Sequence, residues 1–308
     1  MTALSAYWNI LYNNILPIFL SAGGGYLLGR TLKPDIRSTS RLAFYLFSPC
    51  LVFTSVTNST LSGGDFGRMA DFTLGVIAIM TVVALACGLA LRLERRLLAS
   101  LIVASIFVNG GNYGLAVTQF AFGDEALARS VIYYTFSTLA VYTLGVVVAS
   151  WGHRPLGGVL RHGLTLPTTW ALLVAGLVRV SGLALPLPAQ RAVGLLSQAA
   201  VPVMLVILGL QLAEARGWPR SRLALILLAS FLQLVVAPLF GLGLAHLLGM
   251  TGPTFQSAVI ESAMPTAVIT TILAVEYDLD PAFMTGTVLF STLLSPLTLT
   301  PLIAYLQR

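Results

Sequence analysis

Two short polar stretches interrupt apolar sequence, and they hold the residues that could bind a ligand. The first stretch lies in an uncharged run from Leu97 to Gly123 and consists of Asn109, Gly110, Gly111, Asn112, Tyr113 and Gly114. The second consists of Glu261, Ser262, Met264, Pro265 and Thr266. Asparagine side chains can hydrogen-bond a carboxylate, and a carboxyl group can carry a proton. These residue types therefore indicate binding of an anion and movement of a proton or another ion.

The elements that must position these residues are membrane helices. Apolar residues make up 57% of the 308 residues, charged residues only 9%, and the mean hydropathy is +0.89. A soluble domain carries about 25% charged residues, so the composition predicts an integral membrane protein. Because one span needs about 20 residues, the apolar blocks predict ten helices. They cover residues 10–29, 38–57, 70–91, 98–122, 127–150, 165–183, 190–213, 221–248, 254–276 and 282–306.

The distribution of basic residues predicts the orientation. Most of the 17 Lys and Arg residues lie in the loops after the first, third, fifth and seventh spans, among them Arg37, Arg41, Arg154 and Arg161. Loops rich in Lys and Arg remain in the cytoplasm. We therefore expect both termini on the non-cytoplasmic side of the cell membrane. The net charge of +6 is explained by this signal, so it does not indicate nucleic-acid binding.

Repeated motifs indicate an internal duplication. The motif Phe136–Leu139 recurs as Phe290–Leu293, and Pro49 corresponds to Pro202 at nearly the same offset. Five spans per half is an odd number, so the two repeats must be inverted in the membrane. Inverted repeats are typical of transporters, whose substrate site lies at the midplane between interrupted helices. Here the fourth and ninth spans are interrupted at corresponding places. The alternative is that each Gly or Pro only marks a kink or close packing.

The interruptions could bind an anion without a buried Lys or Arg. Each half-helix that starts there presents free N–H groups and a positive dipole end. Tyr113 could cover an apolar substrate body, or it could pack within the core. Glu261, a carboxylate at membrane depth, indicates a proton or ion coupling site, unless it is only a structural partner. Asp71 is a second candidate, although an ion pair with Arg68 is the simpler interpretation.

The stretch from Asn109 to Ala116, followed by Phe122 to Ala126, resembles the fourth-helix signature of the auxin efflux carrier family. Phe47-Ser48-Pro49 and Val201-Pro202-Val203-Met204 support the resemblance, which extends over the whole chain. It implies the fold of bile-acid/sodium symporters and sodium/proton antiporters. Spans 1, 2, 6 and 7 would form a scaffold, usually dimeric, and spans 3–5 and 8–10 a mobile transport domain. The resemblance also implies an elevator mechanism, with substrate bound where spans 4 and 9 cross.

We therefore expect an all-α integral membrane protein that carries a small organic anion, auxin-like or a mono- or dicarboxylate. It would form a single membrane unit and act as a carrier rather than an enzyme. We expect no cofactor or metal, since zinc and phosphate-binding motifs are absent from the sequence. Its partners would be the anion, the bilayer, a proton or sodium ion, and a second copy of the chain. The alternatives are a sodium-coupled symporter and a non-transporting membrane receptor with the same fold.

Overall fold

The part of the chain that the structure describes folds into helices joined by short loops. This computed structural model describes residues 3–149, 166–183, 185–215, 217 and 219–308. In chain order the helices are α1 (Ala3–Ile10), η1 (Leu11–Ile15), α2 (Leu16–Thr31), α3 (Ile36–Leu42), η2 (Ala43–Phe47), α4 (Ser48–Asn58), α5 (Gly63–Ala90), α6 (Arg95–Ile106), η3 (Gly110–Gly114), α7 (Leu115–Phe122), α8 (Asp124–Ala140), η4 (Val141–Gly145), α9 (Val146–Ala149), α11 (Pro167–Ser181), α12 (Leu187–Glu214), η5 (Arg220–Arg222), α13 (Leu223–Phe231), η6 (Leu232–Val236), α14 (Ala237–Leu247), α15 (Gly252–Ser262), α16 (Ile269–Glu276) and α17 (Pro281–Leu306). All η segments are π-helical except η5, a 3₁₀ turn.

Five of the described helical stretches are long and apolar enough to cross a bilayer. They are Gly63–Ala90, Asp124–Ala149, Leu187–Glu214, Arg220–Leu247 and Pro281–Leu306. The other five predicted spans fall on helices that are shorter, such as the 15-residue α11, or interrupted, such as α6–α7 and α15–α16. The prediction of an all-α integral membrane protein is confirmed. The count of ten spans and the inverted repeat stay predictions.

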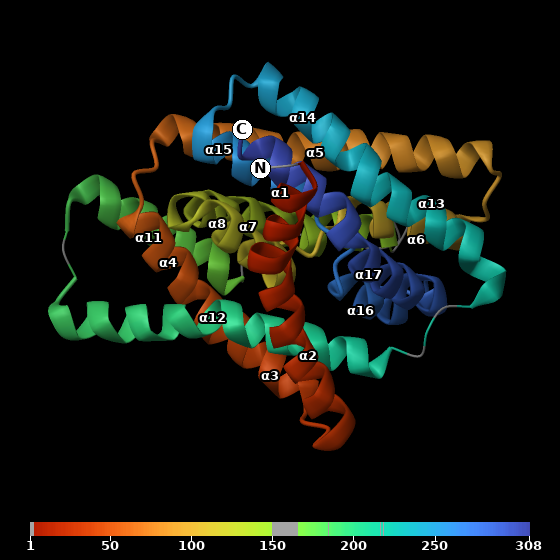
Figure 1. Cartoon of the computed structure of the whole chain (residues 1–308), viewed down its shortest axis with the longest axis horizontal. Helices are drawn as coiled ribbons and strands as arrows, with labels where there is room; N and C mark the ends of the chain where they lie inside the picture. Colours follow the sequence, from red (N-terminus) through yellow and green to blue (C-terminus); the bar gives the residue numbers. More distant parts are fainter. Residues whose placement is uncertain (1–2, 150–165, 184, 216, 218) are drawn as a thin grey trace.

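The helices form two groups, which we call the panel and the bundle. The panel consists of α2, α4, α11 and α12, where α12 packs on α2 and α4, and α11 packs on α4. The bundle consists of α5–α8 and α13–α17. In Figure 1, α12 runs along the lower side of the molecule, α5, α13 and α14 lie along the upper side, and α7 and α8 lie between them. The two groups meet where α4 contacts α8 and α12 contacts η3.

Two glycines allow α2 and α12 to pack backbone against backbone in the panel. A Cβ atom on Gly25 would lie 2.2 Å from the Val206 carbonyl oxygen. A Cβ atom on Gly209 would lie 1.9 Å from the Ala22 carbonyl oxygen. Both distances are far below van der Waals contact, so only glycine fits at either place. Small residues at such crossings are typical of membrane helices.

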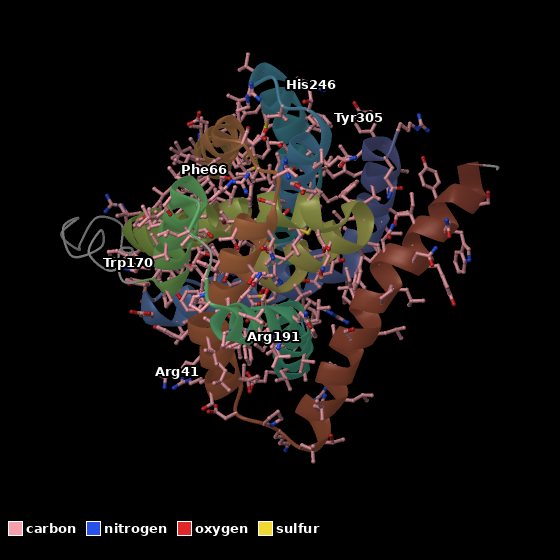
Figure 2. All side chains as sticks on the ribbon, turned by 90° about the vertical axis from the view of Figure 1, so that its left-hand side faces the viewer. Arg41, Phe66, Trp170, Arg191, His246 and Tyr305 are labelled. Carbon is pink, nitrogen blue, oxygen red and sulfur yellow. The ribbon has the colours of Figure 1, made fainter. Side chains whose placement is uncertain are left out.

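Large apolar side chains cover much of the outside of the molecule. Figure 2 shows Trp170 and Tyr305 at its margin, and these side chains are 57% and 51% exposed. Val180 of α11 and Leu247 of α14 are 89% and 83% exposed. A soluble monomer rarely exposes so many large apolar side chains, whereas lipid solvates them favourably. Arg154 and Arg161, which contributed to the predicted orientation, lie outside the described residues.

Candidate functional site

The two polar stretches of the sequence meet in the structure as a pair of extended segments. α6 ends at Ile106, before residues of low helix propensity, and α15 ends before Pro265, because the residue preceding a proline is disfavoured in a helix. The Asn109 N–H donates to the Pro265 carbonyl at 2.7 Å, and the Ala267 N–H donates to the Phe107 carbonyl at 2.8 Å. The segments 107–109 and 265–267 therefore run antiparallel and satisfy each other's backbone groups.

Several predicted site residues hold this pairing in place from within the core. The Thr266 hydroxyl donates to the Ala104 carbonyl at 2.9 Å, and the Thr266 N–H donates to the Ser291 hydroxyl at 3.2 Å. The Tyr113 and Ser295 hydroxyl oxygens lie 3.0 Å apart, and the Tyr113 side chain is fully buried. These contacts connect α6, η3 and α17 with the segment that follows α15, so they fix the position of both interruptions.

A cavity of about 610 Å³ reaches the paired segments, and we call it the break cavity. One wall consists of Val108, Asn109, Gly110, Gly111 and Asn112 from the first interruption, and Ala267, Val268 and Ile269 from the second. Further lining residues come from η2, α4 and α12, among them Met204, Ile207 and Gln211. The Asn109 amide nitrogen is buried and has no hydrogen-bond partner in the described structure. A ligand in the break cavity could provide the missing acceptor.

The lining of the break cavity divides the predicted site residues into two sets. Asn109, Gly110, Gly111 and Asn112 line it. The others are buried and are absent from its lining: Tyr113, Gly114, Glu261, Ser262, Met264, Pro265 and Thr266. Asp71 lies apart from both sets, on an exposed part of α5. Among the described residues, no ion pair joins Asp71 to Arg68, and a role for Asp71 stays a prediction.

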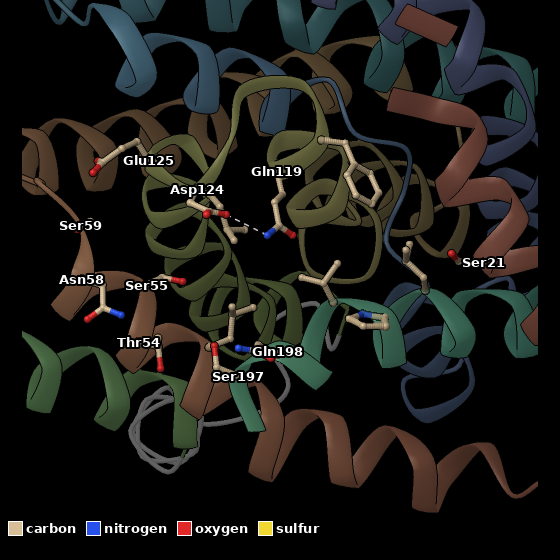
Figure 3. A pocket seen from close by; sticks show the side chains of 16 residues that line it. Ser21, Thr54, Ser55, Asn58, Ser59, Gln119, Asp124, Glu125, Ser197 and Gln198 are labelled. Carbon is tan, nitrogen blue, oxygen red and sulfur yellow. Dashed lines mark hydrogen bonds between the residues drawn. The ribbon is translucent and has the colours of Figure 1, made fainter. Parts of the chain in front are cut away.

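A second cavity of about 510 Å³, the distal cavity, lies between the same two helix groups. The panel contributes Ser21 of α2, Thr54, Ser55 and Asn58 of α4, and Ser197 and Gln198 of α12, and the bundle contributes Gln119, Asp124 and Glu125 (Figure 3). The Gln119 amide donates to the Asp124 carboxylate at 3.0 Å. Neighbouring residues of α4 and α12 line the two cavities, since Ser48 and Met204 line the break cavity and Leu51 and Leu205 the distal cavity.

The structure also places charged residues that the sequence analysis did not count among the candidate site residues. Arg37 and Arg41 of α3 line the break cavity, together with Glu276 at the end of α16. Their role could not be inferred from the sequence, because loop arginines also serve as orientation signals. Arg129 is buried, donates to Thr254 at 2.9 Å and pairs with Glu125 at 2.7 Å. The spacing of four residues between Glu125 and Arg129 was the available signal.

Comparison with known proteins identifies the family. The family model described as "Membrane transport protein" matches residues 10–154 and again residues 152–303. The chain belongs to this family. It is 31% identical over 284 residues to an "Uncharacterized transporter" of Methanothermobacter thermautotrophicus, covering 89% of this chain and 91% of the relative. It is 28% identical over 314 residues to a "Putative malonate transporter" of Rhizobium meliloti, covering 96% and 95%.

The family membership agrees with the resemblance to auxin efflux carriers that the sequence motifs indicated. Together with the apolar helices, it makes the chain a multi-pass membrane transport protein with a small-molecule substrate. The break cavity, with glycine and asparagine residues at its end, is the candidate place for that substrate.

Proposed function

We propose that this protein carries a small organic anion, a mono- or dicarboxylate, through the break cavity by alternating access. One observation carries the proposal: the N-terminal residues of two half-helices line the same cavity. η3 leads into α7, and Val268 and Ile269 are the N-cap and the first residue of α16. Helix N-termini present N–H groups and a partial positive charge, so their convergence favours an anion.

The other groups around the break cavity fit the same ligand. The buried Asn109 amide nitrogen without a partner could donate to a carboxylate oxygen. Arg37 and Arg41 would raise the local concentration of anions at the entrance. The volume of about 610 Å³ lies within the range of small-molecule sites, about 300–1,000 Å³. Malonate is the first substrate to test, because one relative is described as its transporter.

The positions of the two cavities support a mechanism in which the bundle moves against the panel. Both cavities lie between these groups, and α4 and α12 line both. A displacement of the bundle along the panel would open the paired segments to one side and then to the other, as in an elevator. We further propose two inverted five-helix repeats, supported by the separate family matches in the two halves. The proposal includes a homodimer in the cell membrane with both termini outside.

Uptake of radiolabelled malonate and indole-3-acetate into proteoliposomes tests this function, with pH and sodium gradients imposed in turn. Asn112→Ala removes an amide from the wall of the break cavity and should lower uptake at least tenfold, the loss expected for one hydrogen bond to a charged group. Asn13→Ala is the matched control, because Asn13 is exposed and lines neither cavity. Equal uptake by the two variants would place the substrate elsewhere.

The imposed gradients separate the alternatives. Stimulation by sodium alone would favour a sodium-coupled symporter. A carboxylate that raises the melting temperature but never crosses the membrane would favour a receptor and refute transport.

A further inference from the structure

Glu261 lies directly behind the glycine segment that forms the wall of the break cavity. Its side chain is fully buried, and it is absent from the lining of the cavity. A Cβ atom on Gly110 would lie 2.8 Å from the Glu261 Oε2 atom, and a Cβ atom on Gly114 would lie 2.4 Å from it. The carboxyl group therefore contacts the backbone of η3 at Gly110 and Gly114, while Gly111 and Asn112 of η3 line the cavity.

The hydrogen bonds of this carboxyl group leave one oxygen unoccupied. Thr118 of α7 donates to Oε1 at 3.3 Å, and Ser130 of α8 donates to the Thr118 hydroxyl at 3.0 Å. Oε2 has no hydrogen-bond partner in the described structure. None of the ion pairs among the described residues includes Glu261. A fully buried carboxylate without a cation is costly, and binding a proton removes this cost.

The charged groups that pack around α15 lie too far along the helix from Glu261 to neutralise its carboxylate. The titratable group that α8 brings toward Glu261 is the Tyr133 phenol, which interacts with it electrostatically. Arg129 of α8 and Asp65 of α5 meet at Thr254, about two helical turns before Glu261. The His246 ring of α14 lies against Phe255, tilted by 45°, in the same early part of α15.

We propose that Glu261 is the binding site of a coupling proton, and that its charge acts through η3 on the anion in the break cavity. This inference rests on the proposed function. A proton from water would bind the free Oε2 atom and convert the carboxylate into a neutral carboxyl group. An anion on the other face of the glycine segment is repelled by the charged form and tolerated by the neutral form. Proton and anion therefore bind together.

The direction of the effect follows from linkage. When one proton must bind with each anion, the apparent affinity falls tenfold for each pH unit above the titration of Glu261. Below that titration the affinity is independent of pH. Uptake should be driven by a pH gradient that is acidic on the side from which the anion enters.

The first measurement is the pH-dependent infrared spectrum of the protein in nanodiscs, from about pH 5 to about pH 9. We expect a titrating carboxyl band that is present in wild type and in Glu94→Gln and absent in Glu261→Gln. Glu94 is exposed and lines neither cavity, so Glu94→Gln makes the same chemical change away from the proposed site. This spectrum requires no substrate. If the band is missing in wild type, the proton site is refuted whether or not the protein transports malonate.

The second measurement is the pH dependence of malonate or indole-3-acetate uptake, whichever the wild type transports. We expect Glu261→Gln to retain uptake near the acidic wild-type level and to lose the tenfold change per pH unit. An unchanged pH dependence in Glu261→Gln would overturn the inference and leave the proposed function intact. Absence of uptake in wild type would refute the proposed function, and with it the linkage.

Discussion

The crossing of α2 and α12 provides the sharpest structural prediction, because two consecutive glycines of α2 should respond in opposite ways. Gly25 is buried against the Val206 backbone, whereas a Cβ on Gly24 would meet nothing within 4 Å. We compare Gly25→Ala with Gly24→Ala, and add Gly209→Ala on the partner helix. The chemical change is the same in all three variants, so a difference reports only the surroundings.

The expected magnitude follows from the distances at the crossing. A Cβ on Gly209 would lie 1.9 Å from the Ala22 carbonyl oxygen and 2.6 Å from the Tyr26 nitrogen. These are backbone atoms, so the helices must separate by about 1 Å or more, and overpacking of this kind costs about 1–3 kcal/mol. Alanine regains up to about 1 kcal/mol of helix propensity at every site. After this offset, Gly24→Ala should stabilise slightly, while Gly25→Ala and Gly209→Ala should destabilise by up to about 2 kcal/mol.

Thermal unfolding of the purified protein in detergent measures this difference. At about 2–4 °C per kcal/mol, Gly25→Ala and Gly209→Ala should melt several degrees below Gly24→Ala. Uptake should also fall, because Met204 and Ile207 of α12 line the break cavity and would shift with the helix. If all three variants have the same melting temperature, at or above that of wild type, the described packing of α2 on α12 in the panel is refuted.

Two further predictions concern the break cavity and the buried acid behind it. Arg37→Gln combined with Arg41→Gln should raise the KM for an anion about two- to fivefold at low salt and have little effect at high salt, because exposed charges are screened over about 10 Å. Arg191→Gln, exposed and outside both cavities, is the control, and a salt-independent loss would contradict electrostatic attraction. Gly114→Ala should destabilise the protein because its Cβ would lie 2.4 Å from Glu261 Oε2, and Glu261→Ala should restore stability in the double variant. Equal melting of Gly114→Ala with and without Glu261→Ala would show that the two residues are apart.

Much of the site could be predicted from the sequence because broken membrane helices have a strong compositional signal. Glycine and asparagine are poor helix formers, so Asn109–Gly114 indicated an interruption of the helix independently of how the neighbouring helices pack. Pro265 gave the same signal in the second half. The structure places both interruptions side by side and opens Asn109–Asn112 to a cavity. The sequence could not specify which side chains face this cavity, because a π-helical turn shifts the register of the residues that follow it.

The residues that the sequence analysis missed are those whose role depends on a neighbouring element. Arg37 and Arg41 line the break cavity only because α3 packs beside α12. Arg129 is buried only because Asp65 and Thr254 approach it from α5 and α15. Tyr113, expected as a possible cover for the substrate, instead reaches Ser295 in the core. Each of these contacts joins residues far apart in the chain, which local patterns cannot specify.

The glycine positions of η3 meet two steric requirements at once, which a residue with a side chain could not. Toward the break cavity, Gly110 and Gly111 leave the backbone accessible, so a ligand can approach the start of α7. Toward the core, Gly110 and Gly114 leave space for the Glu261 carboxyl group. A Cβ atom on Gly111 would lie 2.6 Å from the Tyr134 ring, which also lines the cavity, and one on Gly110 or Gly114 would displace the acid. The wall between a buried acid and the candidate anion site is therefore a single backbone turn, thin enough for the charge on one side to affect binding on the other.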